Sequence, residues 1–188
     1  EILKTPLEIK YVFFTPSFLQ NQRATKLIEK FSVNSLQIFE IDENLFSNLA
    51  ETKNSQGIIV ISQKPNTGQQ VIYQNLSQKP FLLLLHQINN PSNLGAILRT
   101  AEAAAVDGII ITKGTADVFS PKTLRGSMGA SFRLPIWVNP SFSEVLNWAN
   151  TLGITSICAD IRSEISYLHI NWEISRLLVF GSEGQGLS

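Results

Sequence analysis

The 188-residue sequence predicts an α/β protein in which a small domain precedes a larger domain built on a parallel sheet. Four continuous apolar runs, at 81–85, 108–112, 154–159 and 177–180, have the composition of strands buried on both faces. Helical patterns separate these runs, and such alternation is typical of a parallel sheet with helices on both faces. A polar stretch containing Pro and Gly, 63–70, precedes the first run and is the best candidate for a linker.

The part of the chain before this linker contains shorter elements. Apolar residues recur at helical spacing over 17–31, which predicts a helix. Residues 36–41 and 57–62 have the composition of strands. Between them, 42–52 begins with Asp42, a residue suited to a helix N-cap, so we expect a small α/β domain here.

The domain boundary is expected within 63–79, which assigns 1–70 to the first domain and 71–188 to the second. The helices of the second domain are predicted over 92–104, roughly 120–128, and 141–151. Ser120 is followed by proline, as at an N-cap with proline in the first helical position. "SFSE" at 141–144 matches a capping box.

The composition is that of a globular protein with a sizeable core, since 44% of residues are hydrophobic and 16% are charged. The formal net charge is zero, which gives no signature of general nucleic-acid affinity but leaves room for a local basic patch. Cys158 is the only cysteine, which excludes a disulfide within the chain and makes the reducing cytoplasm the expected compartment. Because Cys158 lies in an apolar stretch, we interpret it as a core residue. No apolar run reaches the length of a membrane span, and no signal peptide is recognised.

The loop after the first apolar run has an unusual composition. Residues 89–104 read NNPSNLGAILRTAEAA. A turn capped by Ser92 explains the proline and the serine, but it does not explain Gly95, which lowers helix stability, or Arg99 after it. Gly95 and Arg99 share a helix face, so a backbone or ligand that approaches the glycine is within reach of the arginine. The segment therefore has two possible interpretations, a phosphate-binding site at the helix N-terminus or a purely structural turn.

The last apolar run leads into a glycine-rich turn, VFGSEGQGLS, at 179–188. Its spacing is not that of the dinucleotide-binding fingerprint, and no Gly-Lys-Ser/Thr follows as in a P-loop. Gly181, Gly184 and Gly186 exceed the needs of a simple turn and favour close backbone approach to a ligand. Because parallel strands end at one edge of the sheet, this turn and Arg99 are expected to meet in one crevice.

Together these segments resemble a known family. Asn93, Gly95 and Arg99, then AEAAAVDGIIIT, SPKTLRGSMGASFRLPI and VFGSEGQGLS, are similar in order and spacing to the SpoU (TrmH-type) RNA ribose 2′-O-methyltransferases of the knotted SPOUT superfamily. The resemblance covers 81–188 closely and implies a parallel-sheet catalytic domain of the trefoil-knot type. Residues 1–62 resemble the small α/β substrate-binding domain that often precedes it, without that domain's first helix.

The family has a third motif, which supplies part of the cofactor pocket and threads the knot. That motif is expected beyond Ser188, so the first domain is interpreted as truncated at its N-terminus and the second at its C-terminus. Neither a completed knot nor a completed cofactor pocket is therefore assumed for these residues.

The resemblance implies an enzyme that moves a methyl group from S-adenosylmethionine to a ribose 2′-hydroxyl of RNA. It assigns catalytic roles to Arg99, Asn93 and Glu183. An arginine stays protonated, so we expect Arg99 to hold the adjacent phosphate and stabilise the developing alkoxide rather than act as a base. Asn93 would orient the substrate or the arginine. Glu183 would fix the glycine turn or position the other two, with a solvent-exposed loop acid as the alternative.

The same resemblance assigns cofactor contacts to Glu183 and to four further residues. Gly181 would receive S-adenosylmethionine against its backbone, and Gly186 would allow the turn to bend. Ala159 and Asp160 follow the run at 154–159 and are expected to line the same cleft. For Asp160, a helix cap is an equal alternative.

RNA is the expected partner. Lys122, Arg125 and Arg133 lie in SPKTLRGSMGASFR and are interpreted as RNA-backbone contacts, with a solvated helix face as the alternative. The leading domain favours ribosomal RNA over transfer RNA, and the family implies a homodimer without membrane association. No metal is needed, because His86 and His169 lack partners at ligand spacing and are interpreted as structural.

Two other classes of function compete with this interpretation. A non-catalytic RNA-binding relative would retain RNA but bind no cofactor, and the joint presence of Asn93, Arg99 and Glu183 argues against such a loss. A nicotinamide-dependent dehydrogenase needs a glycine fingerprint after the first strand and an acidic residue after the second. The segments HQINNPSN and IIITKGT supply neither.

Overall fold

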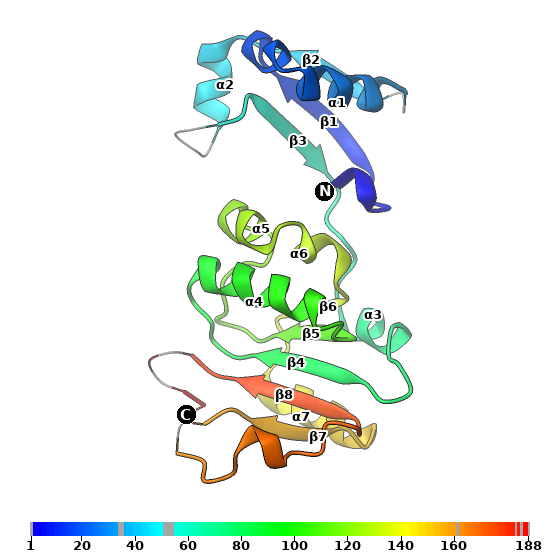
Figure 1. Ribbon diagram of the computed structural model, residues 1–188, viewed down its shortest axis with the longest axis vertical. Coiled ribbons are helices and arrows are strands. Elements are labelled where there is room, and N and C mark those ends of the chain that lie inside the picture. Colours follow the sequence, from blue (N-terminus) through cyan, green and yellow to red (C-terminus); the bar gives the residue numbers. More distant parts are fainter. Residues whose placement is uncertain are drawn as a thin grey trace. The chain divides into compact units, whose positions relative to one another are not determined.

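The computed structural model describes residues 2–33, 36–50, 55–160, 162–182, 184 and 186–187 (Figure 1). The chain divides into two compact units. Residues 3–65 form the smaller unit, and residues 66–188 together with the first two residues form the larger one. No described helix is long and apolar enough to cross a membrane.

The smaller unit is a three-stranded sheet with helical connections. β1 (Ile9–Phe14) lies between β2 (Gln37–Glu40), which runs parallel to it, and β3 (Ile58–Ser62), which runs antiparallel. Its helices are η2 (Pro16–Gln20), α1 (Gln22–Val33) and α2 (Glu43–Leu49). Val12, Phe31 and Phe46 are buried in its core.

Two features of this unit differ from the sequence prediction. β1 is not among the predicted strands, although IKYVFF has strand composition. The single helix predicted over 17–31 is wrong, because the extended backbone of Asn21 (φ −100°, ψ 126°) separates the short helix η2 from α1. The Asn21 side chain accepts a hydrogen bond from the Arg23 backbone N–H at 2.9 Å, which favours a new start of the helix at this point.

The larger unit contains a wholly parallel sheet in the order β6–β5–β4–β8–β7. The strands are β4 (Phe81–Leu85), β5 (Gly108–Ile111), β6 (Ile136–Val138), β7 (Thr155–Cys158) and β8 (Arg176–Phe180). The four predicted apolar runs are confirmed as strands, whereas β6, which has only three residues, was not predicted. The strand order reverses between β4 and β8, and in open α/β sheets ligands bind at such a switch point.

Helices cover both faces of this sheet (Figure 1). α4 (Pro91–Ala103), α5 (Pro121–Ser127) and α6 (Ala130–Arg133) belong to one layer, and α3 (Gln69–Gln74) and α7 (Phe142–Thr151) to the other. Alternate residues of β4 separate the two cores: Leu83 packs in the α4 layer, and Leu82 in the α7 layer. Two short helices complete the fold, η1 (Ile2–Lys4) and η3 (Tyr167–His169), the latter within the β7–β8 connection.

Side-chain caps begin three helices of the larger unit, α4, α5 and α7. The capping box of α7 is confirmed, since Ser141 and Glu144 bond reciprocally to each other's backbone N–H. Ser120 caps α5 as predicted. The predicted cap Ser92 is wrong: Asn90 caps α4 by accepting a hydrogen bond from the Ser92 backbone N–H at 2.9 Å. Pro91 takes the first helical position, which leaves Ser92 inside the helix.

The strand β7 is less buried than its apolar sequence predicts. It lies at the edge of the sheet, and Thr155 and Cys158 are exposed. The interpretation of Cys158 as a core residue is therefore wrong. An edge strand has one neighbouring strand instead of two, so apolar composition alone does not ensure burial.

Asp107 anchors the turn that leads into the central strand. Its carboxylate accepts hydrogen bonds from the backbone N–H groups of Ser77, at 2.8 Å, and Phe81, at 2.7 Å. In the Asp107→Ala variant both donors lose this acceptor, so we expect the free energy of unfolding to fall by about 2–3 kcal/mol. Chemical denaturation followed by tryptophan fluorescence measures this, because Trp137, Trp148 and Trp172 all lie in the larger unit. An unchanged unfolding midpoint would contradict it.

Candidate functional site

Two loops meet at the switch point of the sheet and enclose a pocket of about 510 Å³. The loop after β4 and the start of α4 contribute the amide side chains Gln87, Asn89 and Asn93. The turn after β8 contributes Gly181 and Gly184. This volume suits a small-molecule or nucleotide fragment, and the pocket lies where open α/β sheets bind their ligands.

The position of Asn93 follows from the local structure of α4. The cap at Asn90 starts the helix, which places Asn93 in its first turn at the carboxyl edge of the sheet. Ile97 lies four residues further on, on the same side of the helix, and lines the same pocket. Asn93 therefore lines the same pocket as the glycine turn, whereas the sequence prediction named Arg99 of this helix.

The glycine turn folds back on itself. Gly186, with φ +65°, donates its backbone N–H to the Ser182 carbonyl at 2.9 Å. A Cβ at Gly181 would overlap the carbonyl of Gly186, so the turn's own backbone lies against one side of Gly181. Gly181 is thus required by the turn, while its exposed side borders the pocket. Glu183 lies outside the described residues.

Arg99 lies on another side of α4. Gly95, Arg99 and Glu102 follow one side of the helix by their spacing. Gly95 packs against α5, and Glu102 forms an ion pair with Arg133 of α6, so this side of α4 faces the helices α5 and α6. Arg99 is exposed and is not among the residues that line the pocket of Asn93 and Gly181. The expectation that its guanidinium meets the glycine turn in one crevice is thus not met within this chain.

Gly95 has a packing role. A Cβ at this position would lie 2.8 Å from the Thr123 carbonyl oxygen and 2.9 Å from the Gly126 Cα, both in the backbone of α5. The close approach expected at this glycine therefore takes place, but with a neighbouring helix of the same chain rather than with a ligand.

A second pocket, of about 490 Å³, lies beside the carboxyl end of β7. Ala159 and Asp160 line it, together with apolar side chains such as Ile157, Tyr167 and Trp172. The sequence analysis expects these two residues in the cleft of the glycine turn; here they line a pocket whose lining residues do not include Gly181 or Gly184. β7 and β8 are neighbours, but the loops that follow them border different pockets.

Asp160 pairs with Arg162 at the rim of this second pocket. The carboxylate accepts hydrogen bonds from the Arg162 guanidinium at 2.7 and 3.0 Å and from its backbone N–H at 2.8 Å. These hydrogen bonds lower the pKa of Asp160 to about 2, so it is ionised at neutral pH. Residue 162 lies in a turn, so the alternative of a helix cap is wrong.

The thiol of Cys158 has a raised pKa. Partial burial raises it most, and the negative charge of Asp160 raises it further. A thiolate therefore forms at higher pH than in a free cysteine, and Asp160→Asn is expected to move its formation to lower pH. The pH dependence of iodoacetamide alkylation measures this, with Asp117→Asn as the control. A profile in Asp160→Asn that is unchanged or moves to higher pH would refute the assignment.

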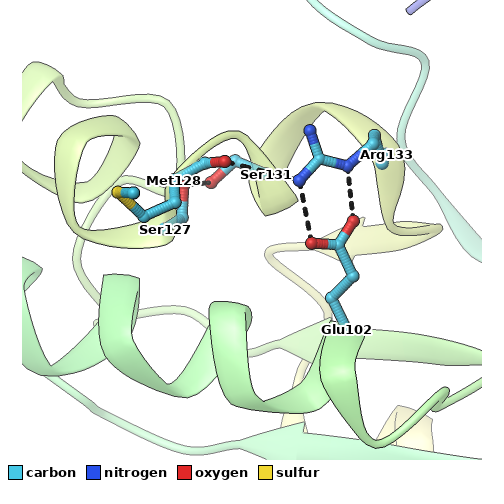
Figure 2. Close-up of polar contacts among 5 residues, drawn as sticks. All are labelled: Glu102, Ser127, Met128, Ser131 and Arg133. Atoms are coloured by element: carbon cyan, nitrogen blue, oxygen red, sulfur yellow. Dashed lines mark hydrogen bonds and ion pairs between the residues drawn. The ribbon is translucent and has the colours of Figure 1, made fainter. Parts of the chain in front are cut away.

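The three cations predicted to contact RNA differ in their surroundings. Lys122 and Arg125 are exposed on α5. Arg133 forms a two-pronged ion pair with Glu102 of α4, through Nε at 2.5 Å and Nη2 at 2.8 Å (Figure 2). The charge of Arg133 is thus balanced within the chain, so a phosphate would have to compete with Glu102 for this guanidinium.

His86, interpreted as structural from the sequence, follows β4. Its Nδ1 lies 2.9 Å from the Thr112 hydroxyl, and its ring lies 4.9 Å from that of Phe142. Among the described residues, no group of three His, Cys, Asp or Glu side chains is placed to hold a metal ion.

Comparison with known proteins agrees with the predicted family. Residues 80–188 match the model of the SpoU rRNA Methylase family, and residues 1–68 match that of the RNA 2'-O ribose methyltransferase substrate-binding domain. The chain is 29% identical over 152 residues to the 23S rRNA (guanosine(2553)-2'-O)-methyltransferase RlmP of Bacillus subtilis, covering 81% of this chain and 58% of the relative. It is 27% identical over 167 residues to the 23S rRNA (guanosine-2'-O-)-methyltransferase RlmB of Neisseria meningitidis, covering 88% and 67%.

Solved structures share the fold. The SpoU methyltransferase AviRb of Streptomyces viridochromogenes, in complex with AdoMet, superposes with a TM-score of 0.87 at 22% identity, covering 99% of this chain and 71% of that structure. The chain spans about three fifths of the length of the curated relatives it matches. Since one family model covers residues 80–188, more than half of the chain, this protein belongs to the SpoU rRNA Methylase family.

Proposed function

We propose that this chain is part of an enzyme that transfers a methyl group from S-adenosylmethionine to a ribose 2′-hydroxyl of RNA. The observation that carries the proposal is the shared pocket of Asn93 and the glycine turn at the switch point of a parallel sheet. Relatives named as 23S rRNA methyltransferases and AdoMet-bound structures of the same fold support it.

The two pockets suit different parts of the reaction. The second pocket combines an apolar lining with the ionised carboxylate of Asp160, which fits the purine and ribose diol of S-adenosylmethionine. The first pocket has several amide side chains, which fit the hydroxyl-rich target nucleotide. We assign Ala159 and Asp160 to the cofactor and Asn93 to the target ribose. Gly181 borders the first pocket, and Gly186 closes the turn through its hydrogen bond to Ser182.

The bound cofactor supplies an electrophilic methyl group on a sulfonium. The ribose oxygen would bond to the methyl carbon as the carbon–sulfur bond breaks, which would leave the thioether S-adenosylhomocysteine. The hydroxyl proton would pass to solvent water, because Arg99 stays protonated. Asn93 orients the hydroxyl, and Arg99 holds the neighbouring phosphate and stabilises the developing negative charge. Glu183 is proposed to position these groups from the glycine turn.

A homodimer reconciles the roles of Arg99 and Asn93. Both belong to α4, but Arg99 faces the α5–α6 side and is absent from the lining of the Asn93 pocket. A guanidinium that acts at this pocket then has to come from a second copy of the chain. We therefore propose that the active site forms between two copies, as symmetric interfaces allow.

Ribosomal RNA is the proposed substrate, in the cytoplasm, with transfer RNA as the alternative. The names of the relatives favour ribosomal RNA. The smaller unit is proposed to bind the RNA, and Lys122 and Arg125 to contact its backbone.

Methyl transfer tests the proposal. The full-length protein is incubated with methyl-labelled S-adenosylmethionine and either ribosomal or transfer RNA, and the RNA is digested to nucleosides. Label in a 2′-O-methylated nucleoside of ribosomal RNA supports the proposal. Label confined to bases contradicts it. RNA retention without cofactor binding would instead favour a non-catalytic RNA-binding protein.

A further inference from the structure

The corner between α5 and α6 contains a non-glycine residue, Met128, with an unusual backbone conformation. Met128 has φ +53° and ψ +33°, in the left-handed region, and the next residue, Gly129, has φ +89°. The Met128 side chain is nevertheless 60% exposed. A non-glycine residue in this conformation has a free-energy cost and persists only where the surroundings fix the backbone.

Hydrogen bonds to the interior side of this corner hold its backbone in place. The fully buried hydroxyls of Ser127 and Ser131 are 3.0 Å apart and hydrogen-bonded. Arg133, held by Glu102, also donates from Nη2 to the Met128 carbonyl at 3.4 Å. Figure 2 shows the Met128 side chain directed away from the Arg133–Glu102 pair. The backbone is thus tied to the layer beneath it, while the methionine side chain points outward.

The exposed side of this corner carries unbalanced positive charge. Lys122 and Arg125 are exposed and lie three residues apart on α5, and the exposed Met128 follows the end of this helix as its C-cap. Within the described part of the chain, the Lys122 and Arg125 side chains make no hydrogen bond or ion pair. The nearby carboxylate of Glu102 is already neutralised by Arg133. The surface is therefore an apolar tip beside two free cations.

We infer that this corner binds an unpaired stretch of RNA, with Met128 against a base and Lys122 and Arg125 on the flanking phosphates. A flexible thioether packs well on aromatic rings, and apolar side chains, methionine included, insert between nucleic-acid bases. The positive charge favours a polyanion over a second copy of this neutral chain. The inference rests on the proposed function, since it concerns how the same RNA is held.

RNA binding by the full chain tests this inference. Fluorescence anisotropy measures affinity for a short single-stranded RNA of mixed sequence over a range of salt concentrations. Met128→Ala is expected to weaken binding about three- to tenfold without changing the salt dependence. Arg125→Ala is expected to reduce the slope of log K against log salt by about 0.7, the loss of one phosphate contact.

Three further variants complete the design. Met128→Gly removes the side chain but favours the left-handed backbone, so it separates loss of the contact from loss of the corner. Leu152→Ala and Lys79→Ala are matched controls, because both side chains are exposed elsewhere in the larger unit.

Each outcome has a distinct meaning. Weaker binding by both Met128 variants, with normal binding by the controls, supports the inference even if the chain transfers no methyl group, in which case only the proposed function fails. Unchanged affinity of the Met128 variants overturns it even if the chain methylates RNA. A change in oligomeric state without a change in RNA affinity also overturns it, because the corner would then contact a second copy.

Discussion

Replacing Arg99 by alanine is expected to lower the rate of methyl transfer to RNA by about 100- to 1,000-fold, the usual effect of removing one preorganised group that stabilises developing charge. Arg99 is exposed and makes no hydrogen bond or ion pair with the described residues, so folding should be unaffected. Arg99→Lys keeps the charge but loses the planar fork and should recover only part of the rate. The measurement is label transfer under single-turnover conditions.

A mixing experiment tests where the guanidinium acts. If Arg99 of one copy serves the pocket of another, the Arg99→Ala variant and an Asn93→Ala variant are each inactive alone. Hybrid dimers formed by coexpression then contain one intact site and recover activity. If no activity is recovered although hybrid dimers form, the residues act within one copy, and the proposed arrangement is wrong. Lys79→Ala, with an exposed side chain in the loop before β4, is the control for coexpression.

Local signals allowed the most accurate sequence predictions. The caps at Ser120 and Ser141 were correctly predicted because each involves residues within one helical turn. The cap of α4 was misassigned to Ser92, although Pro91 already indicated that the first helical position precedes it. A rule that places proline first would have found Asn90.

Signals that depend on neighbouring elements were harder to interpret. Cys158 lies in an apolar run, but nothing in that run indicates that β7 takes the edge of the sheet. Likewise, Ala159 and Gly181 both follow strands that were correctly predicted, yet their loops border different pockets. Strand order and loop direction are set by packing of the whole sheet, and residue spacing does not encode them.

The side of α4 that carries Gly95 and Arg99 shows both what local spacing predicts and what it leaves out. Their spacing correctly places them on one side of α4. Which neighbour that side meets is a tertiary property, and the neighbour is α5. The glycine therefore has a structural role, while the catalytic role that the family resemblance implies for the arginine one turn later stays a proposal.

Replacing Gly95 by alanine is expected to be the most destabilising single-methyl change in the α4–α5 layer. The added Cβ would lie 2.8 Å from the Thr123 carbonyl oxygen and 2.9 Å from the Gly126 Cα. Both are backbone atoms, so relief requires the two helices to separate. Overpacking of this kind costs up to about 3 kcal/mol, and the gain in helix propensity offsets about 1 kcal/mol. We expect a net loss of about 2 kcal/mol.

Two variants separate packing from propensity. In Gly126→Ala the nearest atom to the new Cβ is the Gly95 Cα at 3.3 Å, a gap that small shifts accommodate, so its loss should be clearly smaller. Ala96→Gly, at an exposed position of α4, measures propensity alone and should cost about 1 kcal/mol. Denaturation followed by tryptophan fluorescence compares the three. If Gly95→Ala is as stable as the wild type, the two helices do not approach so closely, and the side of α4 that carries Arg99 is then open to a ligand after all.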